Sequence, residues 1–240
     1  MKDLTLFQPP TRPWNTPNLS PFCIKLECYL RMAEIPYKSA AMQRTKAPKG
    51  KIPYVELPGG KLLGDSQLII EQLERDLTAE GKLALDAGLS ARDVATGHLT
   101  RRALEEGYYF VMMYMRWKTE DGFAATREEI KKFVPGIVVP LVRRDIRKKL
   151  HGQGTGRHTE AEVIALGGSD FDACAELLGD RPFLLGEKPR TVDCTLFAFL
   201  EGVLGFPVDS PLKARISAHA NLVAYRQRIR DRWWKDLKDA

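Results

Sequence analysis

The strongest constraint on the fold is the order in which strand and helix signals follow one another in the first 77 residues. Residues 4–7 alternate weakly between apolar and polar side chains, as in a short strand, and the proline-rich segment 8–18 ends that strand because proline cannot donate to a sheet ladder. Apolar side chains then recur at helical spacing from Pro21 to about Ile35, with Ser20 in position to cap the helix. The chain is therefore predicted to start with a strand, a loop and a helix.

Further elements complete this region. A strand is predicted over residues 37–42, a hairpin over 53–63 that turns at residues 58–60, and a helix from Ser66 to Leu77. A strand, a helix, a strand, a hairpin and a helix within about 75 residues make a small sheet with helices packed against it. This order is typical of the thioredoxin-like α/β fold, which we assign to residues 1–78.

The remainder of the chain is predicted to be almost entirely helical. Residues 79–89 show no clear period and are interpreted as a linker, and an all-α domain is assigned to residues 90–240. A glycine-rich stretch at residues 152–156 interrupts the helical pattern. Long helical patterns are present over residues 90–117, 126–150, 159–178, 191–204 and 212–234.

Composition and charge argue against several classes of protein. The longest apolar runs fall well short of the roughly 20 residues that a membrane span requires, so no spanning segment is predicted. The N-terminus lacks the pattern of a secretory signal, and a cytoplasmic location is therefore expected. The net charge of +6 comes from basic residues interleaved with acids, which favours small anionic ligands over nucleic acid. Four cysteines match neither a disulfide scaffold nor a zinc pattern, and no metal site is predicted.

Short motifs at the junctions of these elements resemble those of a known family. They are Ser20-Pro21-Phe22-Cys23 before the first helix, Lys51-Ile52-Pro53 before the hairpin, and Asp65-Ser66 before the second helix. In this order and at these spacings they resemble the cytosolic glutathione transferases, and the resemblance extends over the whole chain. The segment Ser20 to Tyr37 looks most like the metaxin-like or failed-axon-connections branch, and the first motif also resembles omega-class and glutaredoxin sites. The resemblance implies a glutathione-binding thioredoxin-like domain, an all-helical second domain, and a homodimer.

Ser20 matches the family position that activates the thiol of glutathione. A thiol in water has a pKa of about 8.5, so little of it is ionised near neutrality. A hydroxyl that donates to a charged acceptor contributes about 1.5 to 3 kcal/mol, which lowers a pKa by roughly one to two units. Ser20, at a helix N-terminus that favours negative charge, suits this role. The alternative is that its side chain only caps the helix.

Cys23 is a second candidate for the chemistry. It stands one turn into the helix, where a CPFC site has its resolving cysteine, but Ser20 replaces the attacking cysteine and a dithiol cycle is excluded. Either Cys23 forms mixed disulfides with glutathione on its own, or it is an inert packed side chain. The other three cysteines, Cys28, Cys174 and Cys194, sit among apolar neighbours and are predicted to be structural.

The other two motifs carry the residues that the resemblance assigns to glutathione binding. The Ile52-Pro53 peptide is expected to be cis, which would expose the Ile52 backbone to the cysteinyl backbone of the tripeptide. Asp65 and Ser66 correspond to the acid-serine pair that receives the γ-glutamyl group, although Asp before Ser is also good capping chemistry. Lys51 is the nearest cation for the glycyl carboxylate, although ordinary surface lysines are as common.

The second substrate is expected to bind against the aromatic and methionine-rich helix near residue 110. By the family's layout one face of this helix borders an apolar acceptor pocket, for which Tyr108, Met112 and Arg116 are candidates, although most of its side chains must belong to the core. Trp14, in the loop before Ser20, is a candidate to cover the same cleft or to pack the loop.

These features together predict an enzyme that uses glutathione as cosubstrate, needs no metal, and transfers the thiolate to a small, largely apolar electrophile. One alternative is a glutathione-dependent thiol transferase or peroxidase based on Cys23. Another is a non-catalytic interaction module, because metaxin-like relatives are associated with scaffolding and protein import. Retention of Ser20, Ile52-Pro53 and Asp65-Ser66 argues against the last of these.

Overall fold

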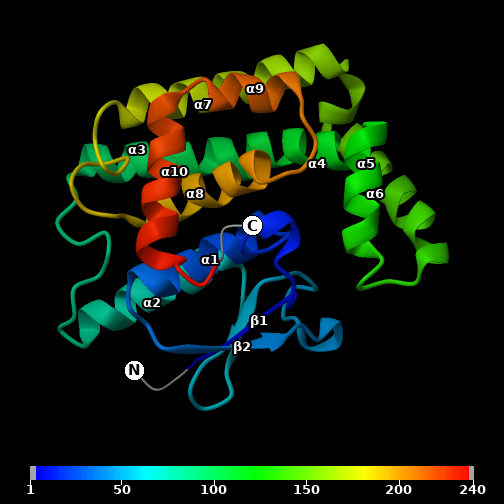
Figure 1. The fold of residues 1–240 in the computed structure, drawn as a ribbon. Helices are drawn as coiled ribbons and strands as arrows, with labels where there is room; N and C mark the ends of the chain where they lie inside the picture. Colours follow the sequence, from blue (N-terminus) through cyan, green and yellow to red (C-terminus); the bar gives the residue numbers. More distant parts are fainter. Residues whose placement is uncertain (1–3, 238–240) are drawn as a thin grey trace.

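The N-terminal part of the chain forms a sheet covered by two helices. The computed structural model describes residues 4–237, and Figure 1 shows their arrangement. The four strands are ordered β2-β1-β3-β4, with β1 parallel to β2, and β3 antiparallel to both β1 and β4. Together with α1 and α2 they make the predicted thioredoxin-like α/β layer. The strands are β1 (Leu4–Gln8), β2 (Tyr37–Ala41), β3 (Tyr54–Glu56) and β4 (Leu62–Gly64), and the helices are α1 (Pro21–Met32) and α2 (Ser66–Ala79).

The rest of the chain is helical, as predicted. A π-helical segment, η3 (Ala103–Tyr108), joins α3 to α4, so that the three form one continuous helix. Helices α5 and α6 lie at one end of the domain in Figure 1. The short 3-10 turns are η1 (Pro13–Asn15), η2 (Arg44–Lys46), η4 (Gly136–Val138) and η5 (Thr155–Arg157). The α-helices are α3 (Ala91–Arg102), α4 (Tyr109–Trp117), α5 (Glu120–Ile130), α6 (Val139–Gln153), α7 (Glu160–Leu178), α8 (Thr191–Leu204), α9 (Pro211–Ser217) and α10 (Ala220–Trp233).

Two of the predicted long helices are in fact pairs. The prediction of a single helix over residues 126–150 was wrong. Helix α5 ends at Ile130, and a turn that begins at Pro135-Gly136 changes the direction of the chain before α6. The helix expected over 212–234 is also divided, between Ser217 and Ala220, and no proline or glycine marks that break. Gly154, with φ of 122°, follows α6 in a left-handed conformation, in agreement with the predicted interruption.

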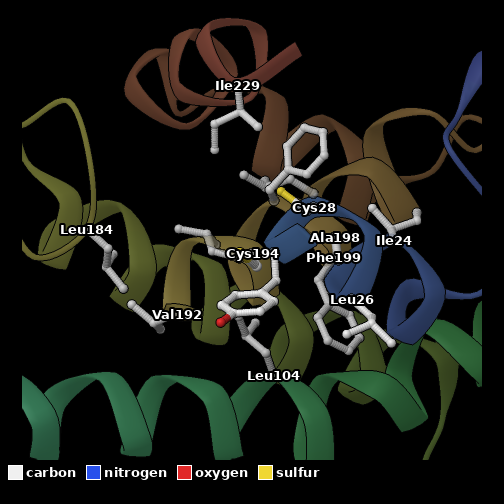
Figure 2. Packing of buried hydrophobic residues seen from close by; sticks show 14 of the residues in the cluster. Ile24, Leu26, Cys28, Leu104, Leu184, Val192, Cys194, Ala198, Phe199 and Ile229 are labelled. Carbon is white, nitrogen blue, oxygen red and sulfur yellow. The ribbon is translucent and has the colours of Figure 1, made fainter. Parts of the chain in front are cut away.

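The main core lies where α1 meets the helical domain. Ten of the twelve residues of α1 are buried, because the helix packs against α8 and α2 and shares a buried cluster with Leu4, Leu6 and Val55 of the sheet. Figure 2 shows this packing from close by. Its labelled side chains come from α1 (Ile24, Leu26, Cys28), α8 (Val192, Cys194, Ala198, Phe199), the π-helical segment (Leu104), the turn before α8 (Leu184) and α10 (Ile229).

The segment between the two domains is held at the start of α8. Asp86 accepts hydrogen bonds from the backbone N–H of Thr191 at 2.9 Å and from its hydroxyl at 2.5 Å. Arg190 donates in return to the backbone oxygens of Leu85 and Ala87. These bonds satisfy donors at the first turn of α8, and they tie the connection to the helical domain.

None of the helices within residues 4–237 has the length and apolar character that spanning a bilayer demands.

Candidate functional site

A cleft of about 690 Å³ lies between the two domains. One wall comes from the first 66 residues of the chain and includes Ser20, Lys51, Ile52, Asp65 and Ser66. The opposite wall is formed by the π-helical segment and by α4, α5 and α6. The structure therefore brings residues of all three junction motifs into one cavity, next to a largely apolar surface from the second domain.

Ser20 is held at the N-terminus of α1 by the loop that precedes it. Its backbone N–H donates to Oδ1 of Asn18 at 3.1 Å, and the Asn18 amide in turn donates to the oxygen of Pro9. Asn18 is buried, and sequence reasoning missed it as a positioning residue. Its signal is that of an Asx turn, in which the side chain bonds to the backbone two residues on.

The Ser20 hydroxyl does not cap α1. The backbone oxygen of Ser20 accepts the first helical bond, from Ile24, while its side chain makes no hydrogen bond to the helix N–H groups. The hydroxyl lies instead beside the Cys23 thiol, an interaction that acts to lower the pKa of that thiol. A hydroxyl proton rotates freely about its C–O bond, so this group can turn to a ligand in the cleft.

Cys23 is not brought to the cleft, which corrects its assignment as a catalytic residue. Its side chain, on α1, has no exposed surface and does not line the cleft. Burial raises the pKa of the Cys23 thiol to about 12, and the hydrogen bond from Ser20 offsets only part of that effect. A neutral, enclosed thiol is a poor nucleophile at physiological pH, so the packed alternative describes this residue.

The second motif presents Ile52 and Lys51 to the cleft. The Ile52-Pro53 peptide is cis, as expected, and Ile52 lies at the cavity wall while Pro53 is buried behind it. Pro53 therefore holds the backbone of Ile52 and does not line the cleft itself. Lys51 and Lys49 are exposed at the same edge, and within residues 4–237 neither forms an ion pair. They provide positive charge at this end of the cavity.

The third motif places Asp65 and Ser66 at the N-terminus of α2. Asp65 has φ of 84°, and its Oδ1 accepts from the N–H groups of Gln67 at 3.0 Å and Leu68 at 3.2 Å. Its carboxylate therefore caps the helix, the alternative that the sequence left open. Ser66 also lines the cleft, and no side chain or backbone group of the described residues accepts or donates a hydrogen bond to its hydroxyl.

The wall that the helical domain contributes to the cleft differs from the sequence-based prediction in one tyrosine. Met112 and Arg116 line the cavity as expected, but Tyr108 lies in the core, 1% exposed, with its ring edge-on to Phe171 at 4.6 Å. Tyr109 takes its place at the wall. Tyr108 and Tyr109 are consecutive residues, which point about 100° apart around a helix, so Tyr109 can face the cleft while Tyr108 is turned into the core.

Trp14 does not line the cleft, which corrects its proposed role as a cover. Its ring packs edge-on against Phe206 at 5.0 Å, in the turn before Ser20. The guanidinium of Arg116 lies 5.7 Å from the centre of the same ring. Trp14 therefore does not contact the cleft directly, but it packs against Arg116, which does.

Much of the apolar wall was not found from the sequence. Residues from α5, α6 and the segment between them enclose the far half of the cavity. The spacing of Val138, Val142 and Ile146 at intervals of four residues is the signal of one helix face, but it did not show that this face borders a cavity. The members of this wall are Thr126, Ile130, Phe133, Val134, Val138, Val142 and Ile146.

Comparison with known proteins decides the family. Isoprene-epoxide–glutathione S-transferase of Rhodococcus sp. (strain AD45) is 30% identical over 237 residues, which cover 92% of this chain and 95% of the relative. The chain belongs to the glutathione S-transferase family. Models of the glutathione S-transferase N-terminal and C-terminal domains match residues 21–122 and 167–229 of this family member.

Other relatives of this glutathione S-transferase family chain belong to the metaxin-like branch. Failed axon connections of Drosophila melanogaster is 27% identical over 92% of the chain, which spans 56% of that longer protein. Human metaxin-2 is 21% identical over 89% of the chain and 82% of its own length. The predicted resemblance to this branch is thereby confirmed.

Solved structures confirm the glutathione S-transferase fold. A transferase from Methylobacterium radiotolerans in complex with glutathione sulfonate superposes with a TM-score of 0.63 at 16% identity, covering all of this chain and 96% of the other. Glutaredoxin 2 of Salmonella typhimurium in complex with glutathione gives 0.58 at 16% identity, covering 99% and 97%. Within residues 4–237 of this family member, His, Cys, Asp and Glu side chains form no cluster suited to a metal ion.

Proposed function

We propose that the cleft binds glutathione and transfers its sulfur to a small, largely apolar electrophile. The observation that carries this proposal is the meeting of Ser20, Ile52 and Ser66 with an apolar wall in one cavity. The relative from Rhodococcus, whose name describes transfer between glutathione and an epoxide, supports the same class of reaction.

Glutathione fits the first wall by its charges and its peptide backbone. The Ile52 backbone can pair with the cysteinyl residue in the manner of an added strand. The Ser66 hydroxyl and the N-terminus of α2 can receive the γ-glutamyl carboxylate, because a helix N-terminus favours negative charge. Lys51 lies at the edge where the glycyl carboxylate would extend. In this pose the sulfur lies at Ser20, next to the second domain.

The reaction then follows from the position of Ser20. The thiol loses its proton to solvent, and the Ser20 hydroxyl donates a hydrogen bond to the resulting thiolate. The sulfur attacks an electrophilic carbon, an S–C bond forms, and the electron pair of the broken bond passes to the leaving group. When the electrophile is an epoxide, that group is the ring oxygen, which remains attached to the product and takes a proton from solvent.

The test is replacement of Ser20 by Ala. Loss of one hydrogen bond to the thiolate should raise the pKa of the bound thiol by about one to two units and lower turnover by roughly 10- to 100-fold at neutral pH. The dissociation constant of glutathione should remain nearly unchanged, because the lost interaction develops with the thiolate charge. Ser169→Ala, on the exposed face of α7, is the matched control and should keep wild-type turnover. Equal activity of Ser20→Ala would end the proposed role.

A second candidate is a non-catalytic interaction module. The relatives named metaxin, one of them described as a mitochondrial outer membrane import complex protein, favour it. The two functions differ in their response to glutathione. A ligand at about 100 times its dissociation constant adds roughly 2.7 kcal/mol to the free energy of unfolding, so a transferase should melt at a higher temperature with millimolar glutathione. An unchanged melting temperature would favour the interaction module.

A further inference from the structure

Arg116 is a buried cation at the junction of the two walls of the cleft. Its side chain is 5% exposed, although it lines the cavity. Nη1 donates to the backbone oxygen of Leu19 at 2.8 Å and Nη2 to that of Gly202 at 2.9 Å. The Nε group is buried and has no hydrogen-bond partner among the described residues. The Nε–H of this almost completely buried guanidinium is therefore left unsatisfied.

Among the described residues, no carboxylate balances this charge. Arg116 takes part in no ion pair within residues 4–237, and its other neighbours are the rings of Trp14 and Phe206, with centres 5.7 Å and 5.4 Å from the guanidinium carbon. Burial lowers the pKa of Arg116 to about 10, against the opposing influence of Tyr108 and Tyr109, and the group stays charged at neutral pH. A buried charge without a partner is costly, so the site is prepared for an anion.

The position of Arg116 indicates which anion this is. The oxygen that accepts from Nη1 belongs to Leu19. The guanidinium therefore bonds to the peptide group that joins Leu19 to Ser20, the proposed activating residue. The other cations of the cleft, Lys49 and Lys51, are exposed and belong to the loop that carries Ile52. The acids of the cavity are Asp65, Glu105 and Glu106, of which Asp65 caps α2 and the glutamates are paired with basic side chains.

We propose that Arg116 supplies the positive charge that balances the thiolate of bound glutathione, an inference that rests on the function proposed above. Ser20 and Arg116 then act from opposite walls on the same sulfur. The serine contributes a hydrogen bond and the arginine a buried charge, which is effective because little water screens it. The competing role for Arg116 is recognition of an anionic group on the second substrate.

The experiment measures the pKa of the thiol of bound glutathione, from the ultraviolet absorbance of the thiolate as pH is varied. An opposite charge within a few ångströms typically lowers an acidic pKa by one to three units, so Arg116→Met should raise the thiol pKa by about one unit or more. Arg116→Lys keeps the charge and should restore most of the lowering. Arg143→Met is the control, because Arg143 also donates to backbone oxygens at the end of α4 but lies outside the cavity.

Ser20→Ala gives a second reading that does not require any change at Arg116. In that variant the thiol pKa should remain below the ordinary value of about 8.5, and the double variant with Arg116→Met should return to it. A thiol pKa of about 8.5 in Ser20→Ala alone would overturn the role of Arg116, even where Arg116→Met fails to fold. An Arg116→Met protein with a wild-type thiol pKa and a raised KM for the acceptor would also overturn it.

Calorimetry separates this inference from the proposed function. A wild-type protein that takes up no glutathione ends both. A protein that binds glutathione with a lowered thiol pKa, and keeps that pKa in Arg116→Met, retains the proposed function and loses only the role of Arg116.

Discussion

The ammonium of Lys25 lies 2.5 Å from the carboxylate of Glu105, and both side chains are buried where α1 meets the π-helical segment. Lys25 also donates to the side chain of Gln67 at 2.7 Å, and Glu105 accepts from Arg101 as well. Burial lowers the pKa of Lys25, while Glu105 opposes that shift. This ion pair therefore ties α1, α2 and the helical domain together beneath the cleft.

Replacement of Glu105 by Gln should destabilise the fold strongly. It leaves a buried lysine without a counter-charge, and removal of one partner of such a pair costs about 3 to 5 kcal/mol of unfolding free energy. Denaturant titration measures the loss. Glu106→Gln is the matched control, because its partner Arg102 is 52% exposed and the loss there should stay below about 1 kcal/mol. Similar losses for the two variants would contradict this account.

Two substitutions at Asp65 should separate helix capping from ligand binding. Asp65→Asn retains an oxygen that can accept from Gln67 and Leu68, and asparagine tolerates the positive φ, so stability should change little. Asp65→Ala should lose about 1 kcal/mol of unfolding free energy. If the charge also holds the γ-glutamyl amine, both variants should bind glutathione more weakly by calorimetry. Unchanged affinity in Asp65→Asn would limit Asp65 to capping.

The native protein should be inert to thiol reagents. All four cysteines are buried, and burial raises the pKa of both Cys23 and Cys174 to about 12. A disulfide reagent at pH 7 should therefore modify no thiol until the protein is unfolded, when four become available. Mass spectrometry after incubation with oxidised glutathione should find no adduct. An adduct on Cys23 in the folded protein would revive the thiol-transferase alternative.

The apolar wall on α6 should determine affinity for the second substrate. Ile146→Ala removes part of that wall, and should lower kcat/KM for a bulky apolar acceptor by about tenfold, because burying such groups contributes about 1 to 3 kcal/mol. The dissociation constant of glutathione should not change. Leu141→Ala is the control on the opposite, exposed face of the helix, where the side chain is 65% exposed. Equal effects of the two substitutions on kcat/KM would remove Ile146 from the acceptor site.

Acid should weaken the contact between the C-terminal segment and α1. Asp236 accepts from Arg31 at 2.6 Å and from Arg12 at 2.5 Å, and these hydrogen bonds hold the pKa of Asp236 well below its ordinary value. The folded state thus binds fewer protons than the unfolded chain in acid, so the contribution is full above about pH 4 and declines as pH falls further.

Asp236→Asn measures that contribution. Because the Asp236 side chain is 46% exposed, its loss should cost no more than about 1 kcal/mol of unfolding free energy at pH 7. The difference from wild type should shrink at pH 3. Asp209→Asn, at a carboxylate that is 98% exposed, should show no comparable effect. A difference that grows in acid would reverse the assigned sign.

The fold and the first wall of the cleft could be predicted because their signals are local. Ser20-Pro21 begins α1, Pro53 precedes β3, and Asp65-Ser66 begins α2, each by backbone chemistry that acts over a few residues. Junctions of this kind lie at the ends of strands and helices, where a small sheet presents its loops to a ligand. The family resemblance predicts that these residues share one cavity.

The second wall could not be predicted because it depends on tertiary packing. The family's layout made Tyr108 a candidate for the cleft, but Tyr109 lies there instead and Tyr108 is in the core. Nor does a pattern of residue types show that Lys25 is buried with Glu105, or that none of the described acids lies beside Arg116. Such facts follow from how helices distant in the chain meet, and a single sequence contains no local signal for them.

The two walls come from separate stretches of the polypeptide, and this division shapes how such a protein can diversify. In the proposed function, residues before position 67 bind glutathione and the wall between positions 105 and 146 contacts the electrophile, so natural variation in that wall would retune the choice of electrophile while glutathione is still recognised. Arg116 is the exception, because it reaches across the boundary to Leu19. A lineage that exchanged this arginine would alter both halves at once.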